Sequence, residues 1–199
     1  MMEGTGMEKQ KYAAIVLAAG SGKRMNSQVH KQYLIIQDRP VLYYSLKAFE
    51  DSAVDEIVLV VGKGEEEFCR KEIVDKYGIS KVKAIVEGGK ERYHSVFEGL
   101  KQTSDADYVL IHDGARPYVK QEYIDSLLEC LKYHKACLLM VPCKDTIKKV
   151  INGKVVETLQ RSQLMQAQTP QAFDTKVILD AYTKAMLEGY QATDDAQIG

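Results

Sequence analysis

A short glycine-rich loop with cations close behind it is the segment of this sequence best suited to chemistry. Between positions 17 and 34 the chain reads LAAGSGKRMNSQVHKQYL, and an apolar run typical of a buried strand precedes it. Its notable members are Gly20, Gly22, Lys23, Arg24 and Lys31. Glycine lets the backbone approach a ligand closely, and cationic side chains then meet a polyanion. The loop therefore predicts a site for a phosphate-rich ligand.

The spacing of this loop differs from that of the common nucleotide-binding motifs. The sequence has no GxxxxGK[ST], and Arg24 and Met25 stand where GxGxxG would place its last glycine. Taken alone, the loop is equally well explained as a turn with solvated basic residues, because short motifs often match by chance. Segments further along the chain decide between the two interpretations.

Five later segments follow the loop in an order that resembles one enzyme family. They are GGKERYHSV from Gly88, IHDGARP from Ile111, DTIK from Asp145, QTPQAF from Gln168 and TDDA from Thr193. Together with LAAGSGKRM and KQYL, they resemble the 2-C-methyl-D-erythritol 4-phosphate cytidylyltransferases of the non-mevalonate isoprenoid pathway. The resemblance runs from about residue 11 to residue 199.

The resemblance implies a cytidylyl transfer in which the phosphate of methylerythritol phosphate attacks the α-phosphorus of CTP and pyrophosphate leaves. Such transfers depend mainly on positioning and charge stabilisation. A phosphomonoester is already close to a dianion at neutral pH, so no general base is required. The implied catalytic residues are Arg24 and Lys31, which stabilise charge on the α-phosphate, and Arg161, which orients the acceptor. His30 stands where the family commonly has proline, which affects how firmly the loop presents Lys31.

The resemblance also implies which residues bind the two substrates. The nucleotide-binding residues are Ala18, Ala19, Gly20, Ser21, Gly22, Arg24, Lys31, Gly89, Lys90, Ser95, Gly114 and Arg116. Those for the polyol phosphate are Asp113, Arg116, Thr146, Arg161, Thr169 and Thr193. Backbone groups of tight loops can match the hydrogen-bonding edge of cytosine. Without the resemblance, Gly88-Gly89 would be read as a simple turn. The alternative for Asp113 and Arg116 is an internal ion pair that only shapes the loop.

Magnesium is the expected cofactor, because the charge of a triphosphate must be neutralised. The sequence shows no carboxylate cluster typical of a dedicated site, so we expect the CTP phosphates to hold the ion. The protein ligands are left unknown, with Asp113 as a weak candidate. His112 ends an apolar strand and is predicted to be structural.

Short apolar runs alternate with helical patterns through most of the chain. Strands are predicted at 13–17, 56–61, 82–86, 108–112 and 136–141, and helices at 41–49, 65–77, 95–101 and 123–133. This order predicts an α/β fold, a three-layer Rossmann-like nucleotidyltransferase sheet that is mostly parallel. Ligands of such sheets bind beyond the carboxyl ends of the strands, where the glycine loop, Gly88-Gly89 and His112-Asp113 all fall.

One segment interrupts the alternation and predicts a protruding β-hairpin arm at about residues 142–163. Residues 146–151 and 154–159 flank Asn152-Gly153, a strong signal for a two-residue turn. An isolated hairpin is marginally stable in water, so it needs a surface to lie on. In the resembling family the arm embraces a second subunit, which predicts a homodimer. The alternative is a solvated excursion of a monomer.

Length and composition bound the remaining possibilities. The chain of 199 residues can bury the core of one domain, here residues 7–199 after a polar extension at 1–6. A net charge of -1 argues against a nucleic-acid or membrane-surface binder. There is no apolar run of transmembrane length and no signal-peptide core. The four cysteines show no CxxC pairing and are predicted to be reduced, buried thiols of a cytoplasmic protein.

Two alternative functions stay open. A ribitol-5-phosphate or other polyol-phosphate cytidylyltransferase would more often show LAGG and HDAVRP, where this chain has LAAG and HDGARP. A non-catalytic nucleotide-binding module would tolerate loss of Arg24, Lys31 or Arg161, and all three are present. The family also uses a lysine about twenty residues beyond TDDA, so its C-terminal segment is expected to be missing from a chain that ends at Gly199.

Overall fold

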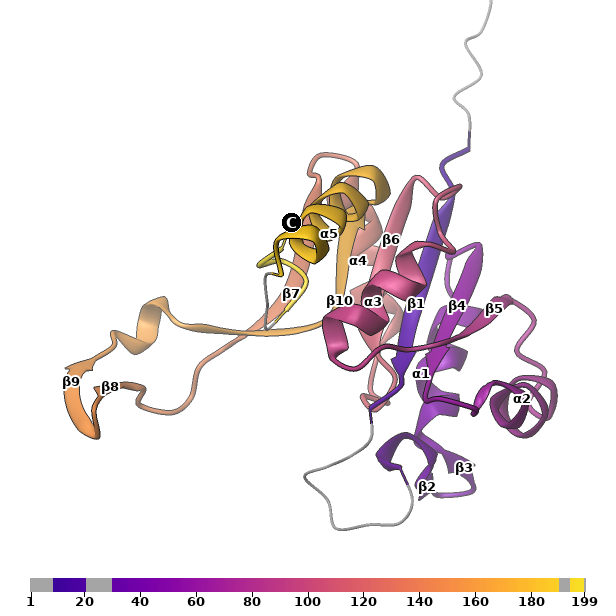
Figure 1. Ribbon diagram of the computed structural model, residues 1–199, viewed down its shortest axis with the longest axis horizontal. Helices are drawn as coiled ribbons and strands as arrows, with labels where there is room; N and C mark the ends of the chain where they lie inside the picture. The colour runs from indigo at the N-terminus through magenta and orange to yellow at the C-terminus, as the bar shows by residue number, and fades with distance from the viewer. Residues whose placement is uncertain (1–8, 21–29, 190–193, 199) are drawn as a thin grey trace, which may run out of the picture.

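A six-stranded sheet in the order β5-β4-β1-β6-β10-β7 forms the centre of the molecule (Figure 1). The computed structural model describes residues 9–20, 30–189 and 194–198. The strands are β1 (Tyr12–Ala18), β4 (Glu56–Val61), β5 (Val82–Glu87), β6 (Tyr108–Asp113), β7 (Ala136–Pro142) and β10 (Met165–Asp174). Strands β5, β4, β1 and β6 run parallel, whereas β10 is antiparallel to both of its neighbours. The sheet is therefore mixed and mostly parallel.

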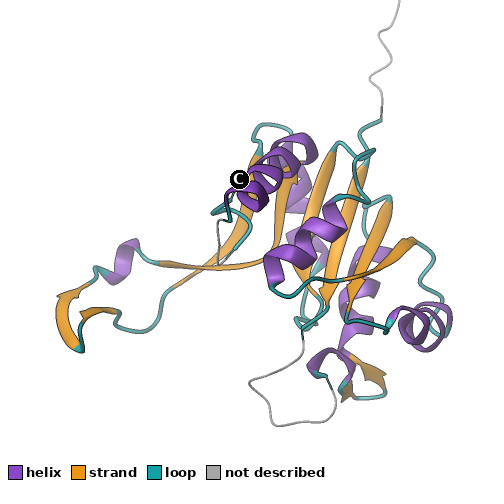
Figure 2. Cartoon of the chain, in the orientation of Figure 1, coloured by secondary structure: helices purple, strands orange, loops and turns teal. Residues whose placement is uncertain are grey.

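Helices cover both faces of this sheet and complete three layers (Figure 2). One face packs against α1 (Val41–Glu50) and α4 (Gln121–Leu131), and the other against α3 (Arg92–Leu100) and α5 (Thr175–Glu188). Strand β1 alternates strictly, sending Val16 into the first core and Ile15 into the second. Burial of both faces explains its continuous apolar sequence. None of the helices described is long and apolar enough to cross a bilayer.

The predicted three-layer α/β architecture is confirmed, and the predicted strands and helices lie within about three residues of the observed ones. The helix predicted at 65–77 is α2 (Glu66–Cys69) continued by a π-helical segment, η2 (Arg70–Asp75). Strand β10 and helix α5 were not predicted. The remaining small elements are η1 (Lys31–Tyr33) and the ribbon of β2 (Ile35–Ile36) and β3 (Arg39–Pro40).

The predicted hairpin arm is present and extends away from the body of the molecule (Figure 1). Strands β8 (Lys148–Ile151) and β9 (Lys154–Thr158) pair in antiparallel fashion, and the short helix η3 (Arg161–Gln163) follows. Asn152 and Gly153 take φ angles of 49° and 75°, as a two-residue hairpin turn requires. Every residue of the two strands is exposed.

The prediction that all four cysteines are reduced is wrong for one pair. Cys130 and Cys137 form a disulfide that joins the end of α4 to the start of β7. The turn from helix to strand brings their Cα atoms to 6.4 Å, within the usual range for such a bond. Cys69 and Cys143 are free and buried, as predicted.

Candidate active site

Three loops meet at the carboxyl edge of the parallel strands. They follow β1, β5 and β6, which places the glycine loop, Gly88-Gly89 and the segment from Asp113 together. Asp113 pairs in register with Leu17, and the Gly114 N–H donates to the Leu17 carbonyl oxygen at 2.8 Å. The Gly88 N–H donates to the last residue of β4, Val61, also at 2.8 Å. This is the edge where open α/β sheets bind ligands.

The first loop is held at its base by a buried amide. Gln32 is only 3% exposed, and its Nε2 donates to the carbonyl oxygens of Ala18 at 2.5 Å and Gly20 at 3.3 Å. Lys31, the neighbour of this anchor, begins η1 and is exposed. Ser21, Gly22, Lys23 and Arg24 lie outside the described residues. The described part of the loop thus presents Lys31 to solvent beside a fixed backbone.

Glu65 ties down the residues on both sides of Lys31. Its Oε1 lies 2.9 Å from Nδ1 of His30, and its Oε2 accepts from the Tyr33 hydroxyl at 2.7 Å. The same Oε2 accepts the Gly62 N–H at 3.1 Å. His30, which replaces the family's common proline, is therefore anchored through its side chain. The segment that carries Lys31 is bound to the start of α2.

The loop after β5 packs directly on the first loop. An ideal Cβ on Gly88 would lie 2.5 Å from Ala19 Cβ and 2.6 Å from Ser95 Oγ, so only glycine fits there. The Gly89 N–H donates to Ser95 Oγ at 3.1 Å. Gly89 and Lys90 are exposed. Ala19, Gly89 and Lys90, three of the predicted nucleotide-binding residues, thus lie in one region, and a fourth, the buried Ser95, supports its backbone.

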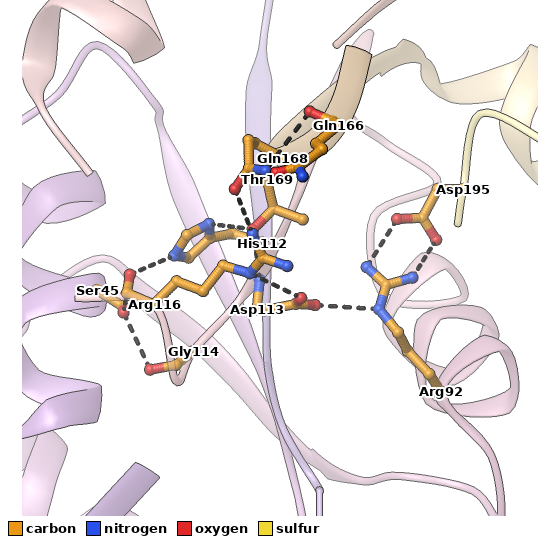
Figure 3. A network of polar contacts seen from close by, with 10 residues as sticks. All are labelled: Ser45, Arg92, His112, Asp113, Gly114, Arg116, Gln166, Gln168, Thr169 and Asp195. Carbon is orange, nitrogen blue, oxygen red and sulfur yellow. Dashed lines mark hydrogen bonds and ion pairs between the residues drawn. The ribbon is translucent and has the colours of Figure 1, made fainter. Parts of the chain in front are cut away.

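The Asp113 carboxylate lies between two guanidinium groups (Figure 3). Arg116 Nε is 3.3 Å from Oδ2, and Arg92 Nε is 3.0 Å from Oδ1. Arg116 also donates to Gln168 Oε1 at 2.7 Å. The internal ion pair of Asp113 and Arg116 considered from the sequence is therefore present. Both carboxylate oxygens have a cationic partner.

Arg92 and Asp195 are site residues that sequence reasoning missed. Arg92 Nη1 and Nη2 reach the two Asp195 oxygens at 2.8 and 2.9 Å (Figure 3). Asp195 is fully buried and also accepts the Tyr182 hydroxyl at 2.5 Å. Burial lowers the pKa of Arg92, but the hydrogen bonds and charges of Asp195 and Asp113 outweigh it, and the pKa is raised. Both residues lie in the quoted motifs, yet 103 positions separate them and no local spacing connects them.

His112 is a satisfied core residue, as predicted. Its fully buried ring donates from Nε2 to the Arg116 carbonyl oxygen at 3.0 Å and accepts the Thr169 hydroxyl at Nδ1, also at 3.0 Å. Burial lowers the pKa of His112 to about 4. Thr169 Oγ1 also accepts the Asp113 N–H at 3.3 Å. Thr169, a predicted substrate residue, thus lies at the site and braces its loop.

Two predicted substrate residues lie far from this edge. Thr146 and Arg161 are exposed on the arm, away from the three loops (Figure 1). Arg161 Nη1 donates to the Lys144 carbonyl oxygen at 3.2 Å, within the arm itself. Thr193 lies outside the described residues. One chain therefore does not bring the arm residues to its own sheet edge.

The described residues do not form a resident magnesium site. Within the described ranges, no three His, Cys, Asp or Glu side chains are grouped so that they could hold a metal ion. Asp113, the candidate from the sequence, has each oxygen paired with a guanidinium. A cation would have to compete with both arginines for this carboxylate.

Fold and site together define the class of α/β nucleotidyltransferases, with small-residue loops and cations at the carboxyl edge of a mostly parallel sheet. A family model described as 2-C-methyl-D-erythritol 4-phosphate cytidylyltransferase matches residues 12–198. The chain belongs to this family, as its motifs predicted.

Individual relatives agree with this assignment. The chain is 49% identical over 191 residues to a 2-C-methyl-D-erythritol 4-phosphate cytidylyltransferase of Lachnoclostridium phytofermentans, covering 95% of this chain and 82% of the relative. It is 46% identical to one of Alkaliphilus metalliredigens, covering 94% and 78%. The crystal structure of 4-diphosphocytidyl-2C-methyl-D-erythritol synthase from Anaerococcus prevotii superposes with a TM-score of 0.83 at 34% identity, covering 95% and 81%.

Proposed function

We propose that this enzyme transfers the cytidylyl group of CTP to 2-C-methyl-D-erythritol 4-phosphate, giving 4-CDP-2-C-methyl-D-erythritol and pyrophosphate. The observation that carries the proposal is the meeting of the family's motif loops at one sheet edge, in a chain that belongs to that family. The relatives' names favour this acceptor over ribitol 5-phosphate. Cations at the same edge favour an enzyme over a passive nucleotide-binding module.

Lys31 and Arg24 are proposed to stabilise the negative charge that builds on the α-phosphate during in-line attack. Lys31 is exposed at the edge, while Gln32 and Glu65 fix the backbone around it. A positioned cation contributes most when charge develops in the transition state. Arg24 is proposed on the family motif alone.

CTP is proposed to lie across the loops that follow β1 and β5. Their close packing at Gly88 leaves backbone groups of Ala18, Ala19 and Gly89 near one another, where they can match the polar edge of cytosine. Gly114 belongs to the neighbouring loop and has no room for a Cβ, which would lie 2.9 Å from the Leu17 carbonyl oxygen. The remaining predicted contacts, Gly20, Ser21, Gly22, Lys90 and Ser95, complete the proposed nucleotide site.

The acceptor is proposed to bind beside Asp113. The carboxylate suits polyol hydroxyls, and the half-exposed Arg116 side chain suits a phosphate. Thr169 lies next to them through its bond to the Asp113 N–H. Magnesium is proposed to arrive with CTP, held by the phosphates, since its charge offsets that of the triphosphate.

A homodimer formed through the arm is proposed to complete each site. The arm exposes four large apolar side chains, Val150, Ile151, Val155 and Val156, each more than half exposed. Water-exposed apolar surface on an isolated hairpin favours association with a second copy. Arg161 and Thr146 would then reach the acceptor in the partner subunit's site, and their position on the arm, away from their own sheet edge (Figure 1), supports this proposal.

The cytoplasm is the proposed location. Cys69 and Cys143 are free thiols, which suits a reducing compartment, whereas the Cys130–Cys137 disulfide argues against one. Alkylation under denaturing conditions during lysis of native cells distinguishes the two, because a reducing compartment predicts four alkylated cysteines per chain and an oxidising one predicts two.

A pyrophosphate-release assay tests the proposed reaction. The full-length protein is incubated with CTP and magnesium, and with either methylerythritol 4-phosphate or ribitol 5-phosphate. We expect release mainly with methylerythritol phosphate. Release mainly with ribitol phosphate would assign the alternative acceptor, and CTP binding without release in either arm would indicate a nucleotide-binding module.

A further inference from the structure

We infer that Arg92 is a positioning residue for the acceptor. The buried Asp195 holds Arg92, and Arg92 in turn holds Asp113 in place when Arg116 turns to a substrate phosphate. The inference rests on the proposed role of Asp113 in binding the polyol. It follows from the unequal way in which two guanidinium groups hold one carboxylate (Figure 3).

Arg92 is the fixed partner of Asp113. Its two terminal nitrogens form a fork on both oxygens of Asp195, which has no exposed surface and a third bond from Tyr182. Such bidentate pairs restrict both the position and the direction of the guanidinium. The remaining nitrogen, Nε, is left to donate to Asp113 at 3.0 Å. The buried Asp195 therefore fixes the direction in which Arg92 Nε donates to Asp113.

Arg116 is the releasable partner. Its contact with Asp113 is a single one at 3.3 Å, and its side chain is 46% exposed, against 33% for Arg92. Among the described residues, its other side-chain partner is the neutral amide of Gln168. A phosphate dianion would attract Arg116 more strongly than either partner does. Arg116 can thus exchange Asp113 for a phosphate with little loss.

The charge balance explains why a second arginine is needed. In the free enzyme two carboxylates, Asp113 and Asp195, face two guanidinium groups. If Arg116 alone balanced Asp113, its departure would leave an anion beside the incoming phosphate, and like charges repel. Arg92 keeps its Nε on Asp113 and stays charged because its pKa is raised, so the carboxylate retains one cationic partner, whose charge Asp195 shares.

The same arrangement joins three segments that are distant in sequence. Arg92 begins α3, Asp113 ends β6, and Asp195 belongs to the segment 194–198. That segment is also fixed to the sheet, because the Ala196 N–H donates to Gln171 Oε1 at 3.0 Å. Gln171 is only 1% exposed. Asp195, which holds Arg92, is therefore part of the folded core.

Steady-state kinetics of full-length variants tests the inference. We expect Arg92→Ala to raise KM for methylerythritol phosphate by about tenfold or more, as for loss of a bond to a charged group, and KM for CTP by less than about twofold. Arg92→Lys keeps the charge but loses the fork, so an intermediate KM is expected. In an Asp113→Asn background, Arg92→Ala should add little, because the two residues act through one contact.

A matched control separates positioning from stability. Asp174→Ala removes the N-cap of α5 at the opposite end of the sheet, so it should lower the melting temperature and leave both KM values unchanged. Equal increases in both KM values for Arg92→Ala, or additive effects with Asp113→Asn, would overturn the inference. An unchanged KM in Asp113→Asn itself would instead show that the proposed role of Asp113 fails, and the inference with it.

Discussion

His112 carries a pH dependence of stability that can be measured directly. Its pKa is about 4 in the folded protein, against an ordinary value of 6.5, so protons bind the unfolded chain more tightly. This contribution to stability is complete above pH 6.5 and is lost as the pH falls toward 4. Linkage gives a loss of about 2 kcal/mol in the free energy of unfolding between pH 7 and pH 5.

Urea unfolding at the two pH values checks this prediction. His112→Gln is the matched variant, because an amide can donate to the Arg116 carbonyl oxygen and accept from Thr169. We expect the variant to lose most of the pH difference. An equal difference in both proteins would show that His112 does not cause it.

Lys31 is predicted to act on chemistry more than on binding. Lys31→Ala should lower kcat by about a hundredfold to a thousandfold, as removal of a charge-stabilising donor does elsewhere. The affinity for CTP should fall much less, because the charge on the α-phosphate grows only in the transition state. Kinetics and calorimetric titration with CTP measure the two effects. Lys23→Ala is the control, and an equal loss in kcat there would show that the effect is only general loop charge.

Glu65 is predicted to support Lys31 without touching substrate. Glu65→Ala removes the side-chain partner of His30 and one partner of the Tyr33 hydroxyl, so the segment between them is held less firmly. We expect kcat/KM to fall about tenfold, as for the loss of one or two hydrogen bonds. Glu67→Ala is the matched control, because Glu67 is an exposed residue of the adjoining helix α2 and pairs with Lys71. Wild-type kinetics in Glu65→Ala would contradict this role.

At the scale of single residues, the sequence predicted the loops better than the contacts. Gly88, Asp113 and Arg116 belong to motifs, and the structure brings their loops together. The contact of Arg92 with Asp195 forms because α3 and the last described segment meet at the sheet edge. No local sequence pattern predicts that meeting. The ion pair of Asp113 with Arg116 was considered from the sequence, whereas the pairing of Asp113 with Arg92 was not.

At the scale of elements, the arm is the feature with the clearest consequence. Deletion of residues 147–160 should remove the proposed dimer contact and leave the core intact, because every residue of β8 and β9 is exposed. Light scattering should give about twice the 22.4 kDa chain mass for the intact protein and a single chain mass for the variant. An intact protein that is monomeric and active would contradict the dimer.

Periodicity explains which elements the sequence revealed. Strands buried on both faces, such as β4, appear as continuous apolar runs and were predicted within a residue or two. Strand β10 has the sequence MQAQTPQAFD, which lacks a continuous apolar run because its first half lies outside the core. It also contains Pro170, and its pairing with β7 shifts register between Ala167 and Gln171. The Cys130–Cys137 disulfide depends on the path of the turn between α4 and β7, which the spacing of the cysteines in the sequence does not predict.

At the scale of the whole molecule, we propose a dimer in which each site combines the sheet edge of one subunit with the arm of the other. The edge offers Lys31, Asp113 and Arg116, whereas Arg161 lies on the arm, away from them (Figure 1). Arg161 is proposed to hold the acceptor, so Arg161→Ala should mainly raise its KM, with some loss of kcat from poorer alignment.

Mixing two impaired variants tests this claim most directly. Lys31→Ala and Arg161→Ala are each assayed alone at low acceptor concentration, where we expect both to be strongly impaired. They are assayed again after subunit exchange, which light scattering or differential tagging verifies. If the site is shared, some mixed dimers hold one site with both residues intact, and activity should recover toward a quarter of the wild-type value in an equal mixture. No recovery after verified exchange would contradict the claim and place Arg161 in its own chain's site, or outside the reaction.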